Sequence, residues 1–340
     1  MKAIRFHQHG GPEVLKYEDV PDPVLRKDQV LIRVKAVALN HLDLFVRQGV
    51  PGVPLPQTPG SDIAGDVVEV GEYVTEVKPG MRVLLAPMSF CGVCERCVSG
   101  QQNFCPHFSV LGYRVPGGDS ELFAAPRVNL LAIPDELTYD EAASVPLVLL
   151  TAWHMLVGRA KVRPGQTVLI LGASSGVGSA AIQIAKLWNC RVIATAGSES
   201  KLDRARELGA DFVIDHYKQK ISEEVKKITA KQGVDVVFEH VGQATWLESV
   251  RSLKPGGTLV TCGATTGPEG VIDLRVLFTR QLNLLGSFMG NMGEFHEVMK
   301  HVFEGRLKAV VDKSFPLREA AAAHEYLAKS NMFGKVILNP

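Results

Sequence analysis

Residues 167–186 read TVLILGASSGVGSAAIQIAK, and this stretch decides the fold. A β-branched strand, Thr167–Leu171, leads into a turn of small residues and then into a helix that reaches Trp188. Small side chains let a phosphate approach the backbone, and the start of the helix offers free N–H groups. The turn predicts a phosphate site, although Ala173 and Ser175 stand where glycines often occur; the alternative is a tight turn that binds nothing. The candidate contacts are Ala173, Ser174, Ser175, Gly176, Val177 and Gly178.

The segments on either side of this turn divide the 340-residue chain into three parts. Up to about residue 135 the apolar runs are short and strand-like, with Pro and Gly between them, which indicates a β-rich domain within residues 1–150. Between 151 and 288, strands alternate with helices, which predicts an α/β doubly wound parallel sheet. Residues 289–340 add two helical runs and a last strand. This length corresponds to about two domains.

The composition excludes several classes of partner. Lys and Arg number 37 and Asp and Glu 36, a net charge of +1, so no global field attracts nucleic acid or an acidic membrane. The most apolar stretch, Ala142–Gly158, is interrupted by Pro146 and His154, which predicts no transmembrane helix. The first residues are too polar for a signal peptide. We expect a cytoplasmic protein that binds a small molecule.

The strand that follows the turn indicates which dinucleotide would bind. Its end, residues 193–198, carries no acidic residue at the position where an NAD enzyme binds the ribose 2′-OH. Ser198, Lys201 and Arg204 follow instead, and Tyr217 comes after the third strand. A hydroxyl group and cations suit a 2′-phosphate, so the sequence favours NADP(H) over NAD(H). The alternative for Lys201 is an ordinary solvated side chain.

Four of the six cysteines lie close together, at C-x2-C-x2-C-x7-C spacing. Four thiolates complete the tetrahedral shell of zinc and leave no position for a substrate, so we expect a structural Zn²⁺ ion. Chance clustering or a disulfide is the alternative, and a reducing cytosol disfavours the disulfide. The predicted ligands are Cys91, Cys94, Cys97 and Cys105.

The order of motifs resembles that of the medium-chain dehydrogenase/reductase superfamily, which includes zinc alcohol dehydrogenases and quinone oxidoreductases. The segments that carry the resemblance are GGPEVL, PGSDIAGDVVEVG, the cysteine lobe at about 88–108, ASVPLVLLTAW, GASSGVG, DVVFEHVG, LKPGGTLVTCG and FGKVIL. The resemblance implies a GroES-like β-barrel catalytic domain from residues 1–150 and 289–340, and a Rossmann NADP-binding domain at 151–288. It also implies a homodimer or homotetramer, with the strand TLVTCG and the segment after it as the pairing edge. Further implied cofactor contacts are Thr151, Gly197, Val241, Gly263, Phe288 and Lys335.

The same resemblance assigns a catalytic zinc to three positions at which this chain lacks zinc ligands. Asn40 and Leu147 stand in place of cysteines, and Ser61 stands in place of a histidine. These side chains cannot form a thiolate and imidazole shell. Without a Lewis acid to activate an alcohol, reduction of an alkene conjugated to a carbonyl is the easier reaction. We therefore expect hydride transfer from NADPH to a quinone, an enone or an enoyl thioester.

Asn40 is the candidate catalytic residue that would stabilise the enolate oxygen, with His41 and Asp62 as weaker candidates. The structural alternative is that Asn40 and His41 cap a helix, while Asp43 and Asp62 form a buried polar pair.

Two other functions stay open at this point. An alcohol dehydrogenase could hold a second metal with His41, Asp43 and Asp62. The second alternative is a non-catalytic NADPH-binding protein, like the lens-crystallin relatives of quinone reductases. The sequence does not identify the substrate, because candidate pocket residues such as Phe45 and Met289 are generic apolar groups.

Overall fold

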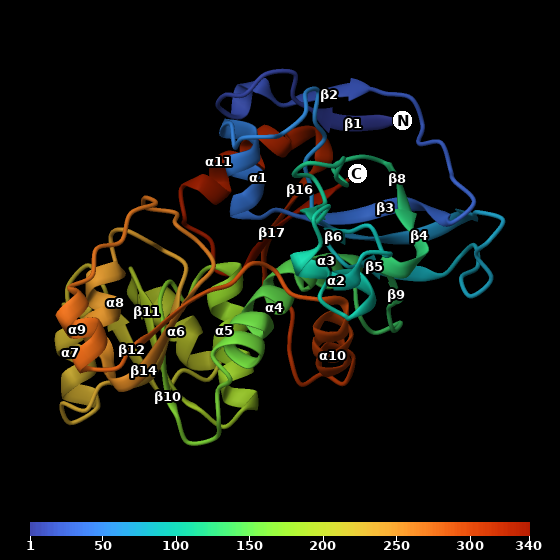
Figure 1. Ribbon diagram of the computed structural model, residues 1–340. Coiled ribbons are helices and arrows are strands. Elements are labelled where there is room, and N and C mark those ends of the chain that lie inside the picture. The colour runs from blue at the N-terminus through green and yellow to red at the C-terminus, as the bar shows by residue number, and fades with distance from the viewer. The chain divides into compact units, whose positions relative to one another are not determined.

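The computed structural model describes all 340 residues, and the chain forms two compact units. Unit 1 comprises Met1–Leu147, Asn291–Phe303 and Ala309–Pro340, and unit 2 comprises Val148–Gly290 and Glu304–Lys308 (Figure 1). The short segment Glu304–Lys308, which the sequence groups with the C-terminal part, therefore clusters with unit 2.

Unit 1 is built on a seven-stranded sheet in the order β16-β17-β3-β4-β5-β9, with β8 paired to β3. The long central strands are β3 (Gln29–Ala38) and β4 (Asp62–Val70), which run antiparallel. Val30, Ile32 and Val34 alternate with less buried residues along β3, so one face of this strand enters the core. The other strands of the unit are β1 (Lys2–Arg5), β2 (Lys16–Asp19), β5 (Arg82–Leu85), β6 (Met88–Ser89), β7 (Ser109–Val110), β8 (Leu122–Pro126), β9 (Leu130–Ala132), β16 (Val311–Pro316) and β17 (Lys335–Asn339).

Five helices accompany these strands: α1 (His41–Gln48), α2 (Glu95–Val98), α3 (Tyr139–Ser144), α10 (Met292–Phe303) and α11 (Ala320–Ala328). Thr138 and Glu141 form a capping box that fixes the start of α3. Helices α1 and α11 pack together, and Leu44 and Leu327 belong to the apolar core between them. This packing ties the C-terminal segment to the N-terminal part of the unit.

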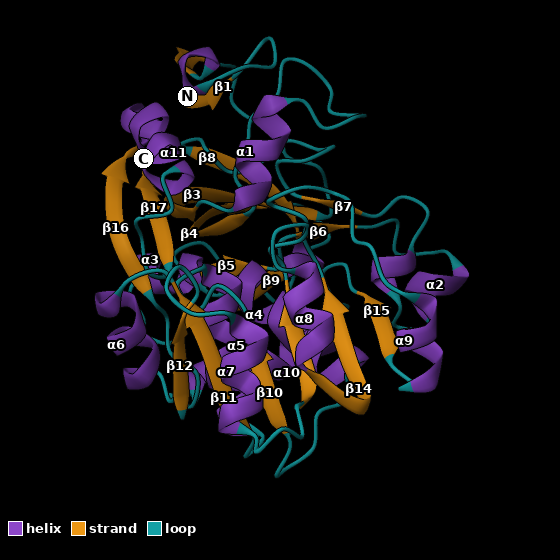
Figure 2. Ribbon diagram, turned by 90° about the vertical axis from the view of Figure 1, so that its left-hand side faces the viewer, coloured by secondary structure: helices purple, strands orange, loops and turns teal.

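Unit 2 contains a parallel six-stranded sheet in the order β12-β11-β10-β13-β14-β15, which confirms the predicted doubly wound α/β fold (Figure 2). Val168, Leu169 and Ile170 of the central strand are completely buried, as expected for a sheet covered on both faces. The strands are β10 (Thr167–Ile170), β11 (Arg191–Ala196), β12 (Phe212–Asp215), β13 (Val234–Glu239), β14 (Leu253–Thr261) and β15 (Asn283–Gly286). The helices are α4 (Pro146–Trp153), α5 (Gly176–Leu187), α6 (Glu199–Glu207), α7 (Ile221–Ile228), α8 (Trp246–Ser252) and α9 (Leu274–Thr279), with a π-helical turn at His154–Arg159.

One edge of this sheet differs from the prediction. Strand β14, which contains Thr258–Thr261 of the segment TLVTCG, is paired on both sides, with β13 and with β15. The open edge belongs to β15, in the segment that follows. The prediction was therefore wrong for TLVTCG itself, because a further strand of the doubly wound sheet covers it.

The apolar stretch near the junction of the two units is longer than the sequence suggested. Helical conformation continues past Pro146, so Tyr139–Arg159 is long and apolar enough, by length and composition, to cross a membrane. However, 83% of its most apolar window is buried inside the protein. Such burial is typical of a core helix.

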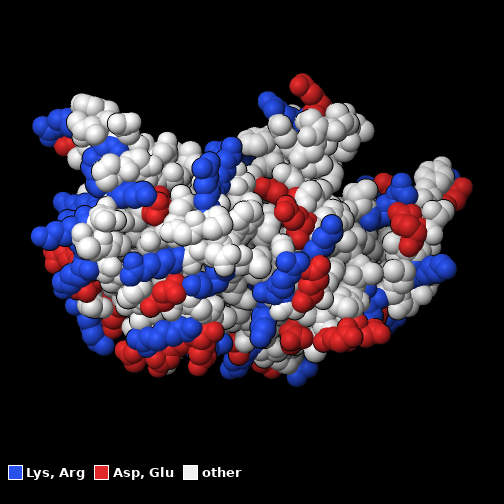
Figure 3. Space-filling view, turned by 90° about the horizontal axis from the view of Figure 1, so that it is seen from below, with Lys and Arg blue, Asp and Glu red and all other residues white.

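Charged side chains of both signs intermingle on the molecular surface. On the face drawn in Figure 3, Lys and Arg alternate with Asp and Glu without a broad area of one sign. This distribution agrees with the net charge of +1.

Candidate functional site

The turn at residues 172–178 lies at the carboxyl end of β10, between that strand and α5. Gly172 has a φ of 58°, and a Cβ on Gly178 would come within 2.2 Å of the Gly172 carbonyl oxygen, so both positions favour glycine. Ser175 caps α5, because its Oγ accepts a hydrogen bond from Gly178 N at 2.9 Å. Strand β10 lies between β11 and β13, where the strand order reverses. The turn therefore occupies the place where doubly wound sheets bind ligands.

The next strand end offers groups for the ribose side of a dinucleotide. A Cβ on Gly197 would come within 2.3 Å of the Tyr217 ring, so glycine lets this ring lie against the backbone. Tyr217 is 82% exposed and meets His216 edge-on at 4.6 Å. Burial lowers the pKa of His216, and the charge of Lys201 lowers it further. His216 was missed at the sequence level, where no motif distinguishes it.

A buried carboxylate shapes the loop after β13. Glu239 is fully buried and accepts hydrogen bonds from Val241 N at 2.6 Å, from Gly242 N at 3.0 Å and from Ser249 Oγ at 2.5 Å. Val241 and Gly263, which the resemblance gives as cofactor contacts, follow the ends of the adjacent strands β13 and β14. Glu239 had no sequence signal, since its role depends on burial and on partners further along the chain.

The remaining predicted cofactor residues lie at different places. Thr151 belongs to α4, and its Oγ1 lies 3.8 Å from the sulfur of Met289. Phe288 follows β15 and is 53% exposed. Lys335 lies at the start of β17 in unit 1, where it contacts the predicted catalytic residues Asn40 and Asp62.

The four clustered cysteines converge on one point. Their sulfur atoms all lie within 4.8 Å of one another, with Cys91 at 3.6 Å from Cys105 and 3.9 Å from Cys97. A tetrahedron with Zn–S bonds of about 2.3 Å has S···S edges of about 3.8 Å. All six cysteines are free, so no disulfide is formed. The N–H groups of Val93 and Cys94 lower the pKa of Cys91 to about 6, which favours the thiolate. The four residues fit a structural zinc ion.

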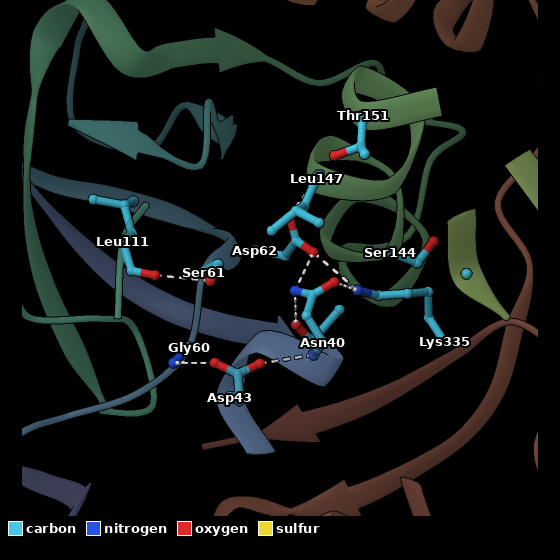
Figure 4. Close-up of polar contacts among 12 residues, drawn as sticks. Asn40, Asp43, Gly60, Ser61, Asp62, Leu111, Ser144, Leu147, Thr151 and Lys335 are labelled. Carbon is cyan, nitrogen blue, oxygen red and sulfur yellow. Dashed lines mark hydrogen bonds and ion pairs between the residues drawn. The ribbon is translucent and has the colours of Figure 1, made fainter. Parts of the chain in front are cut away.

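Three neighbouring strands bring Asn40, Asp62 and Lys335 together (Figure 4). Ala38 of β3 pairs both with Ile337 of β17 and with Asp62 of β4, so residues from three distant segments meet at one end of the sheet. Lys335 Nζ donates to Asn40 Oδ1 at 2.5 Å and to Asp62 Oδ2 at 3.0 Å, and Asn40 Nδ2 donates to Asp62 Oδ2 at 2.9 Å. All three side chains are buried. We call them the Lys335 cluster.

The hydrogen-bond count in this cluster constrains the role of Asn40. Its Nδ2 also donates to Ala38 O at 3.3 Å, so both amide hydrogens are engaged. The amide cannot be reversed, because an ammonium group has no acceptor and must face Oδ1. Asn40 also caps α1, as the structural alternative expected, but the residue that completes the capping box is Asp43 and not His41. In this arrangement Asn40 has no N–H left for a substrate, whereas Lys335 has one.

The residues at the two other positions where the resemblance would place zinc ligands also form hydrogen bonds within the protein. Ser61 Oγ donates to Leu111 O at 2.7 Å, and Leu147 contributes its backbone N–H to Asp62 Oδ1 at 2.8 Å (Figure 4). His41 is the half-buried first residue of α1. The group of four cysteines has metal-site geometry, but His41, Asp43 and Asp62 do not form such a group. The alternative second metal site is therefore not assembled.

Two further carboxyl groups are buried in unit 1: Asp43, which lies in α1, and Asp119. Burial raises the pKa of Asp43 to about 6, although the N–H groups of Asn40 and Gly60 partly offset this effect. Asp119 is completely buried, and neither of its oxygens has a hydrogen-bond partner. Burial, together with the charge of Asp43, raises the pKa of Asp119 well above its ordinary value. Sequence reasoning missed Asp119, because only the fold encloses it.

Asp119→Asn is expected to stabilise the protein, and more strongly as the pH rises between about 5 and 8. A carboxyl group with a raised pKa in the folded state binds protons more tightly there than in the unfolded chain. Its contribution to stability therefore decreases with rising pH, by at most about 1.4 kcal/mol per pH unit. The free energy of unfolding in urea, measured across this range, checks the prediction. The exposed Asp135→Asn variant is the control, and a gain for Asp119→Asn that does not change with pH would contradict it.

Known proteins resemble this chain over its whole length. Residues 26–135 match the family described as alcohol dehydrogenase GroES-like domain, and residues 176–304 match zinc-binding dehydrogenase. A solved structure described as an NAD-dependent alcohol dehydrogenase is 42% identical, with a TM-score of 0.97 and full coverage of both chains. Quinone oxidoreductase from Rattus norvegicus is 32% identical over 348 residues, covering 99% of this chain and 97% of that protein. The chloroplastic NADPH-dependent alkenal/one oxidoreductase of Arabidopsis thaliana is 33% identical, covering 100% of this chain and 80% of that protein.

Proposed function

Because this chain belongs to the medium-chain dehydrogenase/reductase superfamily, we propose that it reduces activated C=C bonds with NADPH and without a catalytic zinc ion. The proposed substrate is a quinone, an enone or an enoyl thioester. The observation that carries the proposal is the buried ion pair of Lys335 and Asp62, hydrogen-bonded to Asn40, which stands where the resemblance would place a zinc ligand. Relatives named for quinone and alkenal/one reduction support it.

The side chains at the three positions where the resemblance would place zinc ligands do not suit a catalytic zinc ion. Asn40 Oδ1 accepts from the Lys335 ammonium, Ser61 Oγ donates to a carbonyl, and Leu147 is apolar. A zinc ion beside Asp62 would also face this ammonium, and two cations repel each other. The proposed reaction therefore has no step that depends on a catalytic metal.

In the proposed reaction the protein stabilises the negative charge that develops on the carbonyl oxygen of the substrate. Bound NADPH supplies the hydride that adds to the β-carbon. Two N–H groups of Lys335 are held by Asn40 Oδ1 and Asp62 Oδ2, and the third is the proposed donor to the oxygen. Water supplies the proton that the α-carbon takes up. His41 stays the secondary candidate for a donor to this oxygen.

The proposed preference for NADPH depends on the groups that follow β11 and β12. Strand β11 ends in Ala196, so no carboxylate is present there to bind a ribose 2′-OH or to repel a 2′-phosphate. Ser198, Lys201 and Tyr217 supply hydroxyl groups and a cation, and His216 lies beside Tyr217. This set suits a dianionic phosphate.

Lys201→Ala is expected to raise the Kd of NADPH by about 10-fold or more, because a charge-assisted hydrogen bond to the 2′-phosphate is lost. The Kd of NADH should change little, since NADH lacks this phosphate. Both constants are measured by fluorescence titration. Lys218→Ala is the matched control, because Lys218 is exposed beside Tyr217 and paired with Asp215. Equal losses for the two cofactors would reject the contact.

A structural zinc ion is proposed at Cys91, Cys94, Cys97 and Cys105, whose sulfur spacing fits the tetrahedral site. Such an ion cross-links a short irregular segment that has little core of its own. The free cysteines also support the proposed cytoplasmic location.

The second candidate function is alcohol oxidation with NAD⁺. The structure described as an NAD-dependent alcohol dehydrogenase favours it, because that protein is 42% identical to this chain. The Lys335 cluster would then have to assist removal of the alcohol proton without a metal ion.

The substrate preferred by the protein after chelation distinguishes the two functions. After treatment that removes loosely bound metal but leaves about one zinc ion per chain, we expect full NADPH-dependent reduction of a small enone or quinone. Alcohols should react slowly. Strong alcohol oxidation would reject the proposal: its survival after chelation would favour the second candidate, and its loss on chelation with recovery on adding zinc would indicate a catalytic metal ion. Absence of NADPH oxidation over a broad panel of substrates would instead favour a non-catalytic NADPH-binding protein.

The assembly is proposed to be a homodimer or homotetramer that pairs through the open edge of β15. Exposed apolar side chains in the segment before this strand, including Leu274 and Phe278, support an interface there. Sedimentation of wild-type protein and of a Phe278→Glu variant tests it.

A further inference from the structure

His240 follows β13 and lies against the turn at residues 172–178. Its Nε2 is 2.8 Å from the carbonyl oxygen of Leu171 and 3.3 Å from Ser175 Oγ. A Cβ on Gly172 would come within 3.1 Å of the imidazole Cε1, so this ring packs closely on the turn. The His240 side chain, which follows the neighbouring strand β13, therefore contacts both Gly172 at the start of the turn and Ser175 within it.

The carbonyl contact determines the tautomer of His240. A carbonyl oxygen only accepts, so Nε2 must carry a hydrogen and cannot accept one from Ser175. Ser175 Oγ accepts from Gly178 N at 2.9 Å and faces this same Nε2–H. Both contacts use Ser175 as an acceptor. Its own hydroxyl hydrogen is left for another partner, and the side chain is only half buried.

We propose that His240 is a positioning residue that makes Ser175 a hydrogen-bond donor to the pyrophosphate of the dinucleotide. This inference rests on the proposed function of the turn. A glycine at residue 175 would offer the ligand only backbone N–H groups, whereas the serine adds a hydroxyl donor. A phosphate oxygen is the acceptor that a helix start attracts.

The neighbouring residues Glu239 and Phe238 fix the position of the His240 side chain. Glu239 fixes the backbone of the following residues through Val241 N and Gly242 N, so the loop that carries His240 is braced. Phe238 meets the imidazole edge-on at 6.0 Å. Burial lowers the pKa of His240, which agrees with a neutral ring whose Nε2 bears the hydrogen.

Binding measurements on four variants test this role: Ser175→Ala, His240→Leu, His240→Gln and the double variant Ser175→Ala/His240→Leu. Titrations use NADPH, NADH and adenosine 2′-monophosphate, which lacks the pyrophosphate. We expect Ser175→Ala and His240→Leu each to raise the Kd of both dinucleotides by about 10-fold. The double variant should bind no worse than Ser175→Ala alone, because both changes remove one interaction. His240→Gln, which keeps an N–H donor, should restore most of the affinity.

The controls separate this role from general damage. Adenosine 2′-monophosphate should bind all variants equally, and thermal unfolding should show that each variant is folded. Dinucleotide binding by His240→Leu at wild-type strength, or losses that multiply in the double variant, would overturn the role of His240 and leave the proposed function intact. Wild-type protein that binds neither dinucleotide would refute the proposed function and this role together.

Discussion

Lys335→Met is expected to lower kcat/KM for enone reduction by about 100- to 1,000-fold, the usual loss when one donor to a developing oxyanion is removed. Methionine keeps the length of the side chain but has no N–H group. The Lys335 ammonium is the only cation hydrogen-bonded to Asp62, so the substitution also removes the positive charge from the cluster. Steady-state kinetics with NADPH and a small enone measures the loss, and kcat should fall together with kcat/KM.

Stability needs separate control in this experiment. Removing one partner of a buried ion pair typically costs about 3–5 kcal/mol, because the other charge stays buried and unpaired. The double variant Lys335→Met/Asp62→Asn removes that charge and should fold while staying inactive. Lys313→Met, on the neighbouring strand β16, changes an exposed lysine and should keep wild-type activity. A folded double variant with activity within about threefold of the wild type would show that Lys335 is not the donor.

Cys105→Ser is expected to abolish stoichiometric zinc binding and to lower the unfolding temperature sharply. A serine hydroxyl is a poor zinc ligand, and structural zinc sites contribute about 10–16 kcal/mol of binding free energy that is coupled to folding. Cys105 is buried beside Cys91, so its loss opens the shell on its enclosed side. Metal analysis of purified protein and thermal unfolding give the two readouts. Hydride transfer should continue below the unfolding temperature.

Cys190→Ser provides the matched control. Cys190 is also a buried free cysteine, but it directly precedes β11 in unit 2 and does not belong to the group of four cysteines. This variant should keep one zinc ion per chain. Retention of zinc by Cys105→Ser at the wild-type level would contradict the proposed site.

The sequence predicted those parts of the site whose signal is local. The turn at residues 172–178 and the four cysteines are defined by residue types at short spacing, and each group is found assembled in the structure. Sequence reasoning also singled out Asn40 as a candidate donor, and this assignment stays a prediction. The carboxamide hydrogens of Asn40 are engaged with Ala38 O and Asp62, which no spacing could reveal.

The sequence by itself determined the alternation of strands and helices in residues 151–288 and the likeness to dehydrogenases, because hydrophobic periodicity and short motifs are properties of neighbouring residues. Only the tertiary structure decided which distant polar groups meet. Lys335 lies 295 positions from Asn40, and the pairing of β17 with β3 brings them to 2.5 Å. Burial likewise singles out Asp119 and Glu239, and the contact with the Tyr217 ring singles out the half-buried His216. Hydrogen-bond partners and desolvation depend on contacts that form after the sheets are assembled, and such contacts have no local sequence signal.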